Sequence, residues 1–164
     1  MSEIDVRLPD GKILRVPAGS SVHEVALRIG KGLARAALAA RIDGRLVDLR
    51  TPLDRDVTLE IVTDRDPAGG EVIRHSAEHV MADAVKRLFP TAQIDVGRSD
   101  HSEKFQYDFL VPRPFTPEDL EQIEKEMGKI VAEKSAFSRE VVTREQAREL
   151  FAAQGEALKL SRLD

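Results

Sequence analysis

The sequence predicts an α+β protein made of two consecutive domains. Apolar and polar residues alternate through much of the first third of the chain, as in strands that bury one face. A break rich in charge, proline and glycine follows, and helical periodicity dominates the remainder. The 164 residues exceed what one minimal domain needs and fit two small ones. An apolar content of 41% with 33% charged residues is ordinary for a globular protein.

The first domain is predicted at residues 1–62. Two alternating runs flank Pro9-Asp10-Gly11, whose turn chemistry indicates a hairpin. Ser21 and Glu24 form a capping box that begins a short amphipathic helix, and Gly30 is placed to end it. Further strands are expected at 38–42, 46–49 and 57–61. A hairpin followed by a helix and more strands predicts a ubiquitin-like β-grasp arrangement.

A linker is predicted at residues 63–70, where proline and two glycines accompany a cluster of charges. The second domain is then predicted at residues 71–164. Its longest helix is expected at 72–89 and ends before Pro90, and extended segments are expected within 92–111.

Two more helices are predicted in the second domain from their capping residues. One begins at Thr116 with Pro117 in its first turn, and the other begins with the box Thr143 to Gln146. The latter is expected to stop at Gly155 and to bury Ala147, Leu150 and Phe151.

Composition excludes several classes of function. The chain has no cysteine, so a disulfide is excluded and any metal site must use His, Asp or Glu. No apolar run approaches the roughly 20 residues that span a bilayer, and the N-terminus lacks secretory features. We therefore predict a cytoplasmic protein without membrane contact. The net charge of −4 has the wrong sign for binding nucleic acid by bulk electrostatics, so any such contact must be local.

His75 and His79 are the strongest candidates for chemistry, because a spacing of four places both imidazoles on one side of a helix. That side is expected to be polar. One interpretation is a pair of solvated histidines. A second is a zinc site, because His-x-x-Glu-His matches a zinc-hydrolase signature with Glu78 as general base and Glu149 or Glu156 as a further ligand. The third uses the imidazoles without metal for hydrogen bonding and proton transfer. The spacing alone leaves all three open.

Longer stretches of sequence carry a resemblance to a known family. Residues 75–89, HSAEHVMADAVKRLF, resemble the start of the editing domain of bacterial threonyl-tRNA synthetases. Gly97, the segment 105–109 and the segment 115–127 follow in the family's order, and residues 1–62 resemble the TGS domain that precedes it. Alanyl-tRNA synthetases and free-standing editing proteins share the His-x-x-x-His fold, but the TGS-like first domain argues against them.

The resemblance implies that this region removes serine wrongly esterified to threonine tRNA. It assigns catalysis to His75 and His79, pocket lining to Gly97 and Tyr107, and no metal to the site. Tyr107 is equally consistent with a cross-strand packing role. The expected partner is the aminoacylated 3′ end of the tRNA. A non-catalytic RNA-binding or assembly role is the main alternative.

The family's editing site has a second pair, Cys-x-x-x-His, which by family spacing is expected beyond Asp164. We therefore expect half of an editing site, with no cofactor of its own. The ligase core, with its ATP, Mg²⁺, Zn²⁺ and homodimer contacts, is expected outside this sequence. Residues 98–104 depart from the commoner family pattern, which is shorter and has glycine just before the phenylalanine. His101 and Lys104 are expected either to reshape the pocket entrance or to lie in a solvated loop.

Overall fold

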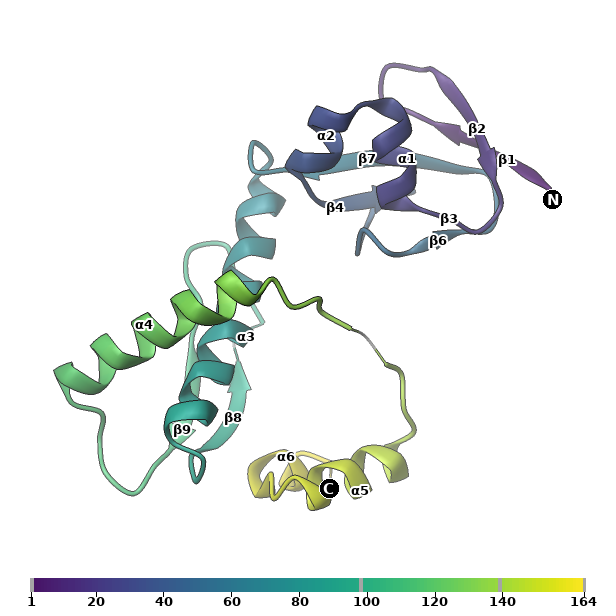
Figure 1. Ribbon diagram of the computed structural model, residues 1–164. Coiled ribbons are helices and arrows are strands. Elements are labelled where there is room, and N and C mark those ends of the chain that lie inside the picture. The colour runs from purple at the N-terminus through teal and green to yellow at the C-terminus, as the bar shows by residue number, and fades with distance from the viewer. Residues whose placement is uncertain (1, 98, 139, 164) are drawn as a thin grey trace. The chain divides into compact units, whose positions relative to one another are not determined.

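The computed structural model describes residues 2–97, 99–138 and 140–163 (Figure 1). The chain divides into two compact units, Met1–Ile73 and Arg74–Asp164. The division falls inside helix α3 (Pro67–Leu88), so that helix contributes its first turns to one unit and the remainder to the other. Among the described residues, no helix is long and apolar enough to cross a membrane.

The first unit is built on a five-stranded sheet with the order β2-β1-β7-β4-β5. Strand β1 pairs antiparallel with β2 and parallel with β7. Because parallel neighbours need a crossover connection, the chain between β1 and β7 must pass across the sheet, and it contributes α1 on the way (Figure 1). This topology confirms the predicted β-grasp arrangement. The strands are β1 (Glu3–Arg7), β2 (Ile13–Pro17), β4 (Ala37–Ile42), β5 (Arg45–Val47) and β7 (Val57–Thr63), with the short pair β3 (Ser20–Ser21) and β6 (Pro52–Leu53) beside them.

Helix α1 (Val22–Ile29) begins and ends where its capping residues predict. The hydroxyl of Ser21 accepts from the amide of Glu24, the Glu24 carboxylate accepts from the amide of Ser21, and Gly30 follows the last turn. A second helix, α2 (Lys31–Ala36), was not predicted, because six residues are too few for a recognisable helical period. The buried core of this unit consists of Ile4, Val6, Val16, Val22, Val25, Ala40, Leu53, Val57 and Leu59.

Residues 67–70, predicted as part of a linker, form the first turn of α3. Contacts with the sheet favour helix here over an irregular segment. The Asp66 carboxylate accepts two hydrogen bonds from the Arg41 guanidinium and one from the amide of Ala68. A Cβ at Gly69 would overlap with the carbonyl oxygen of Thr63, so the backbone approach requires glycine. Composition alone therefore suggested a break where tertiary contacts support a helix.

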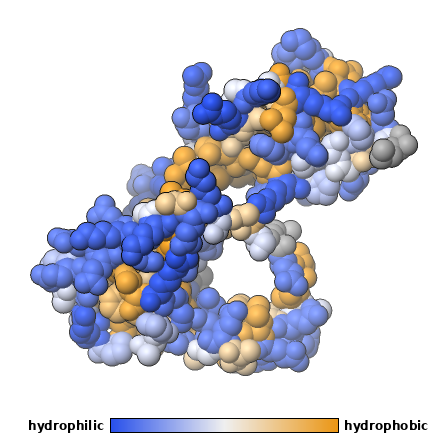
Figure 2. Space-filling view, in the orientation of Figure 1, coloured by the Kyte–Doolittle hydropathy of each residue, from blue (hydrophilic) through white to orange (hydrophobic). Residues whose placement is uncertain are grey.

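In the second unit, α3 packs with the antiparallel hairpin β8 (Gln93–Gly97) and β9 (Tyr107–Leu110) and with α4 (Pro117–Glu133). The predicted start of α4 is confirmed, with Thr116 and Asp119 forming a capping box around Pro117. Hydrophilic residues cover the outer side of α4 in Figure 2. The buried residues of this core are Ala84, Val85, Ala92, Ile123 and Ile130.

The last part of the unit contains α5 (Arg144–Ala153) and the unpredicted α6 (Ala157–Ser161). The capping box Thr143 to Gln146 is confirmed, but the burial expected along α5 is wrong. Leu150 is 47% exposed, and Ala147 and Phe151 are only partly buried. The physical reason is that the contact of this segment with the unit runs through α6, which packs on β8.

Candidate functional site

His75 and His79 lie one turn apart on the exposed side of α3, as the spacing predicts. Their Nε2 atoms are 3.2 Å apart and their ring centroids 4.9 Å apart. One of the two nitrogens donates and the other accepts, so this contact requires at least one neutral imidazole. The exposed pair can therefore offer both a donor and an acceptor to a bound group.

Gly97 and Tyr107 are brought to the same place by the pairing of β8 with β9, where they lie opposite each other. The Tyr107 hydroxyl lies 3.5 Å from Nδ1 of His79, and the two rings meet edge to face. Burial raises the pKa of the Tyr107 phenol, so the hydroxyl keeps its proton and remains a donor. The structure thus brings Tyr107 to the histidine pair, and it places Gly97 beside Tyr107 and Glu78.

Gly97 has a steric reason to be glycine. A Cβ built at this position would overlap with Oε1 of Glu78 and would lie 3.0 Å from Cε1 of Tyr107. The missing side chain therefore allows the Glu78 carboxylate and the Tyr107 ring to approach the strand backbone.

We expect Gly97→Ala to displace the Glu78 carboxylate and to lower the unfolding free energy by about 1–3 kcal/mol, as overpacking typically does. Urea unfolding followed by circular dichroism measures the change. Gly128→Ala in α4 is the matched control, because nothing lies within 4 Å of its Cβ position. That control is expected to be neutral or stabilising by up to about 1 kcal/mol, since alanine is the better helix former. Equal effects of the two substitutions would contradict the steric role of Gly97.

Glu78 and His101 form a buried pair that was not predicted from the sequence. Glu78 is 1% exposed and His101 9% exposed, and Oε2 of Glu78 lies 2.7 Å from Nε2 of His101. The His101 ring also stacks on the His75 ring, with centroids 4.4 Å apart and an interplanar angle of 19°. The solvated-loop interpretation is therefore wrong for His101, whereas Lys104 is exposed.

One signal for this pair was present in the sequence. Glu78 precedes the buried Val85 by seven residues, which places a carboxyl group on the apolar side of the helix. A carboxylate on a buried face requires a polar partner elsewhere in the fold. Its identity was not readable, because His101 is 23 residues away in the chain.

The arrangement does not support the zinc-hydrolase interpretation. Glu78, the candidate general base, is buried and already bonded to His101. Glu156 is buried in an ion pair with Lys86 at 3.0 Å, and Glu149 is exposed. Among the described residues, no group of three or more His, Asp or Glu side chains is arranged to hold a metal ion. The residues therefore do not fit a resident zinc ion.

The pKa of His79 lies below its ordinary value of 6.5. Partial desolvation of this largely exposed ring by its neighbours is the main cause, and the neighbouring His75 imidazole adds to it. Lys159 and His101 act in the same direction, while Glu78 opposes them. His79 is consequently neutral at pH 7 and can accept a proton.

We expect an NMR titration of the imidazole protons to give a pKa for His79 below 6.5 and a higher pKa in the variant His75→Gln. Because the folded pKa is lowered, the unfolded state binds more protons as the pH falls below 6.5. The contribution of His79 to stability is therefore present above that pH and is lost below it. His23 in α1 serves as the reference histidine within the same sample. A titration of His79 at or above 6.5 would contradict this electrostatic account.

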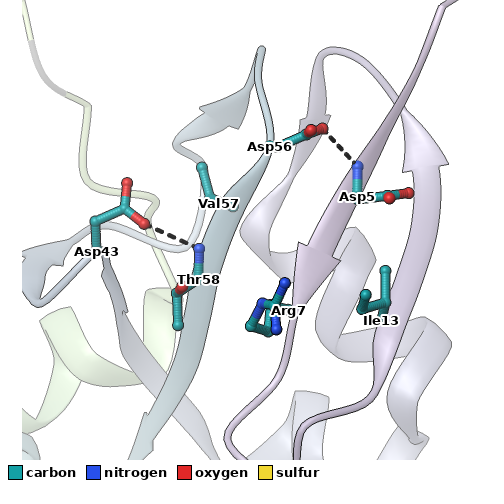
Figure 3. Close-up of a pocket in the computed structure, with 7 residues that line it drawn as sticks. All are labelled: Asp5, Arg7, Ile13, Asp43, Asp56, Val57 and Thr58. Atoms are coloured by element: carbon teal, nitrogen blue, oxygen red, sulfur yellow. Dashed lines mark hydrogen bonds between the residues drawn. The ribbon is translucent and has the colours of Figure 1, made fainter.

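A groove in the first unit is lined mainly by polar and charged residues, which Figure 3 shows. Two of its carboxylates are already engaged with the backbone. Asp56 accepts from the amide of Asp5 at 2.8 Å, and Asp43 accepts from the amide of Thr58 at 2.9 Å. These bonds stabilise the ends of strands, so the groove is explained by the fold.

Comparison with known proteins connects this geometry to a family. Residues 4–63 match the TGS domain. The chain is 49% identical over 163 residues to the threonine–tRNA ligase of Symbiobacterium thermophilum, covering 99% of this chain and 25% of that protein. It is 51% identical over 154 residues to the threonine–tRNA ligase of Alkalilimnicola ehrlichii, covering 94% of this chain and 24% of that protein. The chain is homologous to the N-terminal region of bacterial threonyl-tRNA synthetases.

This result confirms the family that the sequence resembles and the identity of the first domain. The chain spans about a quarter of the length of these threonyl-tRNA synthetases. The similarity extends over both units, because the matching regions cover 94–100% of the chain. The similarity to these ligases is therefore not confined to the TGS domain.

Proposed function

We propose that the second unit is part of an editing module that hydrolyses serine from mischarged threonine tRNA. The observation that supports this function best is the exposed pair of imidazoles, with Nε2 atoms 3.2 Å apart, beside the Tyr107 hydroxyl. Such a cluster offers hydrogen-bond donors and acceptors for a seryl hydroxyl or a terminal ribose. The proposed binding partner is the aminoacylated 3′ end of the tRNA.

The proposed reaction needs one proton acceptor near the ester. Nε2 of His79 contacts His75, so neutral His79 takes the proton from water at Nδ1, beside the Tyr107 hydroxyl, as the water oxygen attacks the ester carbonyl carbon. The bond between that carbon and the ribose oxygen then breaks, and the proton passes to the leaving oxygen. The products are free serine and tRNA with its terminal hydroxyl restored. His75 acts as the partner that holds and orients the bound group.

Discrimination against threonine follows from the small size difference between the two amino acids. A single methylene is worth only about 1–3 kcal/mol in a pocket, so one binding step separates serine from threonine poorly. A second site that admits the hydroxyl and excludes the added methyl group removes the error. The polar groups around His79 suit that requirement better than an apolar wall.

This hydrolysis requires no cofactor from the chain. We assign the ATP, Mg²⁺ and Zn²⁺ that the family implies to the ligation reaction of the longer synthetases. The homodimer is assigned to those longer proteins as well. A cytoplasmic location is part of the proposal, since tRNA charging supplies the substrate.

Binding is tested on the 164-residue chain with a stable analogue of the substrate end, 3′-seryl-amido-adenosine. Imidazole signals of His75 and His79 are expected to shift in a saturable manner, whereas those of His23 are not. A titration with uncharged tRNA tests the alternative of non-catalytic RNA binding. Shifts with tRNA that leave both site histidines unchanged, together with none from the analogue, would favour that alternative.

Catalysis is tested in a chimera in which this chain replaces the matching quarter of the Symbiobacterium thermophilum ligase. The chimera is expected to hydrolyse Ser-tRNA faster than Thr-tRNA of the same threonine tRNA. Release of labelled amino acid measures both rates. Equal rates for the two substrates, or no hydrolysis of either, would contradict the proposed function.

A further inference from the structure

Glu78 and His101 lie behind the histidine pair rather than in it. Glu78 follows His75 by three residues on α3, and His101 lies in the loop between β8 and β9. Both side chains are buried, and they are joined by the bond of 2.7 Å between Oε2 and Nε2. The amide of Gln106 points to the same Oε2 from 3.4 Å. The Glu78 carboxylate thus connects the loop to the helix, next to the point where the His101 ring stacks on the His75 ring.

Arg74 forms a second connection between the helix and the same loop. The Arg74 guanidinium donates from Nε to the carbonyl oxygen of His101 and from Nη2 to that of Ser102, the latter at 2.7 Å. Arg74 and Glu78 are one helical turn apart, so both can reach His101. Arg74 binds its backbone carbonyl, and Glu78 binds its ring. The position of the His101 ring is therefore determined from two directions.

The geometry between His101 and His75 shows how His101 can act on His75. Their rings are stacked nearly parallel, at 19° and 4.4 Å, and no hydrogen bond joins them. A proton relay from Glu78 through His101 to His75 would require an N–H to nitrogen contact, which stacking does not provide. A fixed stacked ring instead limits the rotation of its neighbour, much as supporting hydrogen bonds orient histidines in metal sites.

We propose that Glu78 and His101 are positioning residues that fix the His75 ring in its contact with His79. The consequence for catalysis rests on the proposed function, but the positioning does not. A group held in reactive geometry needs such support, because small displacements of reacting groups cost much of the rate.

Several charged and titratable groups surround His79 and act on its pKa. They are His75 and Glu78 on α3, His101 in the loop, Tyr107 on β9 and Lys159 on α6. Glu78 raises the pKa of His79, and His101 lowers it. Loss of the one and loss of the other are therefore expected to move the titration of His79 in opposite directions.

The test compares four variants of the 164-residue chain by imidazole NMR: Glu78→Gln, Glu78→Ala, His101→Gln and His101→Ala. We expect His101→Ala to alter the tautomer populations of His75 and His79, which ¹⁵N shifts report. Glu78→Gln retains an acceptor oxygen, so it is expected to keep the His75 ring position while lowering the pKa of His79. Glu78→Ala removes both the acceptor oxygen and the charge. It is therefore expected to change the position of the His75 ring and also to lower the pKa of His79. His101→Gln is expected to raise the pKa of His79.

The same substitutions are assayed in the chimera for deacylation of Ser-tRNA. Glu78→Ala and His101→Ala are each expected to lower kcat by about 10–100-fold with little change in KM, as losses of supporting residues do. Combining them is expected to cost little more than either alone, because they act as one unit. Glu78→Gln is expected to recover part of the loss.

Matched controls separate positioning from folding. Glu71→Ala replaces an exposed glutamate on the same helix, and His23→Ala replaces an exposed histidine in the other unit. Both are expected to leave the site signals unchanged. Thermal melting shows whether Glu78→Ala folds. If it does not, the test uses His101→Ala, which changes a residue in the loop. Unchanged His75 and His79 signals in folded His101→Ala overturn the inference. Altered signals without any deacylation by the parent chimera overturn only the proposed function.

Discussion

The chimera carrying His79→Ala is expected to deacylate Ser-tRNA about 10²–10⁴-fold more slowly than the parent, the range typical for loss of a general base. The reason is the protonation state, because partial desolvation keeps the pKa of His79 below 6.5 and the ring free to accept a proton. Single-turnover release of labelled serine measures the rate. The parent rate is expected to fall as the pH drops below 6.5, because protonation removes the acceptor.

His23→Ala is the control for that substitution, since it removes an exposed histidine of α1. It is expected to leave deacylation unchanged. A rise in KM with constant kcat for His79→Ala would mean that His79 only binds the substrate. A loss smaller than about tenfold, below the range for general bases, would remove His79 from the chemical step.

Leu59→Ala is expected to lower the unfolding free energy of the first unit by about 2–5 kcal/mol. Leu59 is 0% exposed at the centre of the core beneath α1, so its truncation removes apolar contacts and leaves a cavity. Urea unfolding of the chain, followed through amide signals of β1 and β7, measures the effect in this unit. It is the largest stability change we expect from a single truncation of the β-grasp core.

Leu46→Ala is the matched control, because Leu46 lies on the edge strand β5 and is 49% exposed. Its effect is expected to stay within about 0.5 kcal/mol, as for most surface substitutions. Similar losses for Leu59→Ala and Leu46→Ala would contradict the assignment of the core. Such a result would also question the register that places Leu59 opposite Ile42.

Features that depend on neighbours in the chain were readable from the sequence. The capping boxes at Ser21, Thr116 and Thr143 each begin a helix where the side chain meets an amide three residues away. The hairpin around Pro9 and the contact of His75 with His79 are equally local. The β-grasp order of the first unit then follows from the alternation of apolar residues and the handedness of crossover connections.

Features that depend on distant contacts were not readable. The helical start of α3 depends on Arg41 reaching Asp66, which lies 25 residues further along. His101 looks like a polar loop residue until Glu78 and His75 surround it. The amphipathic pattern of α5 suggested burial, although the unit offers that helix little surface to cover. In each case the presence or absence of contacts between residues distant in the sequence decided the outcome.

The double variant His75→Ala/His79→Ala in the chimera decides whether these two histidines perform editing. The measurement is the single-turnover rate of Ser-tRNA hydrolysis, with folding verified by circular dichroism and with His23→Ala as the control. Hydrolysis is expected to fall to the uncatalysed rate in the double variant and to stay at the parent rate in the control. Hydrolysis by the folded double variant at the parent rate would contradict the proposed function.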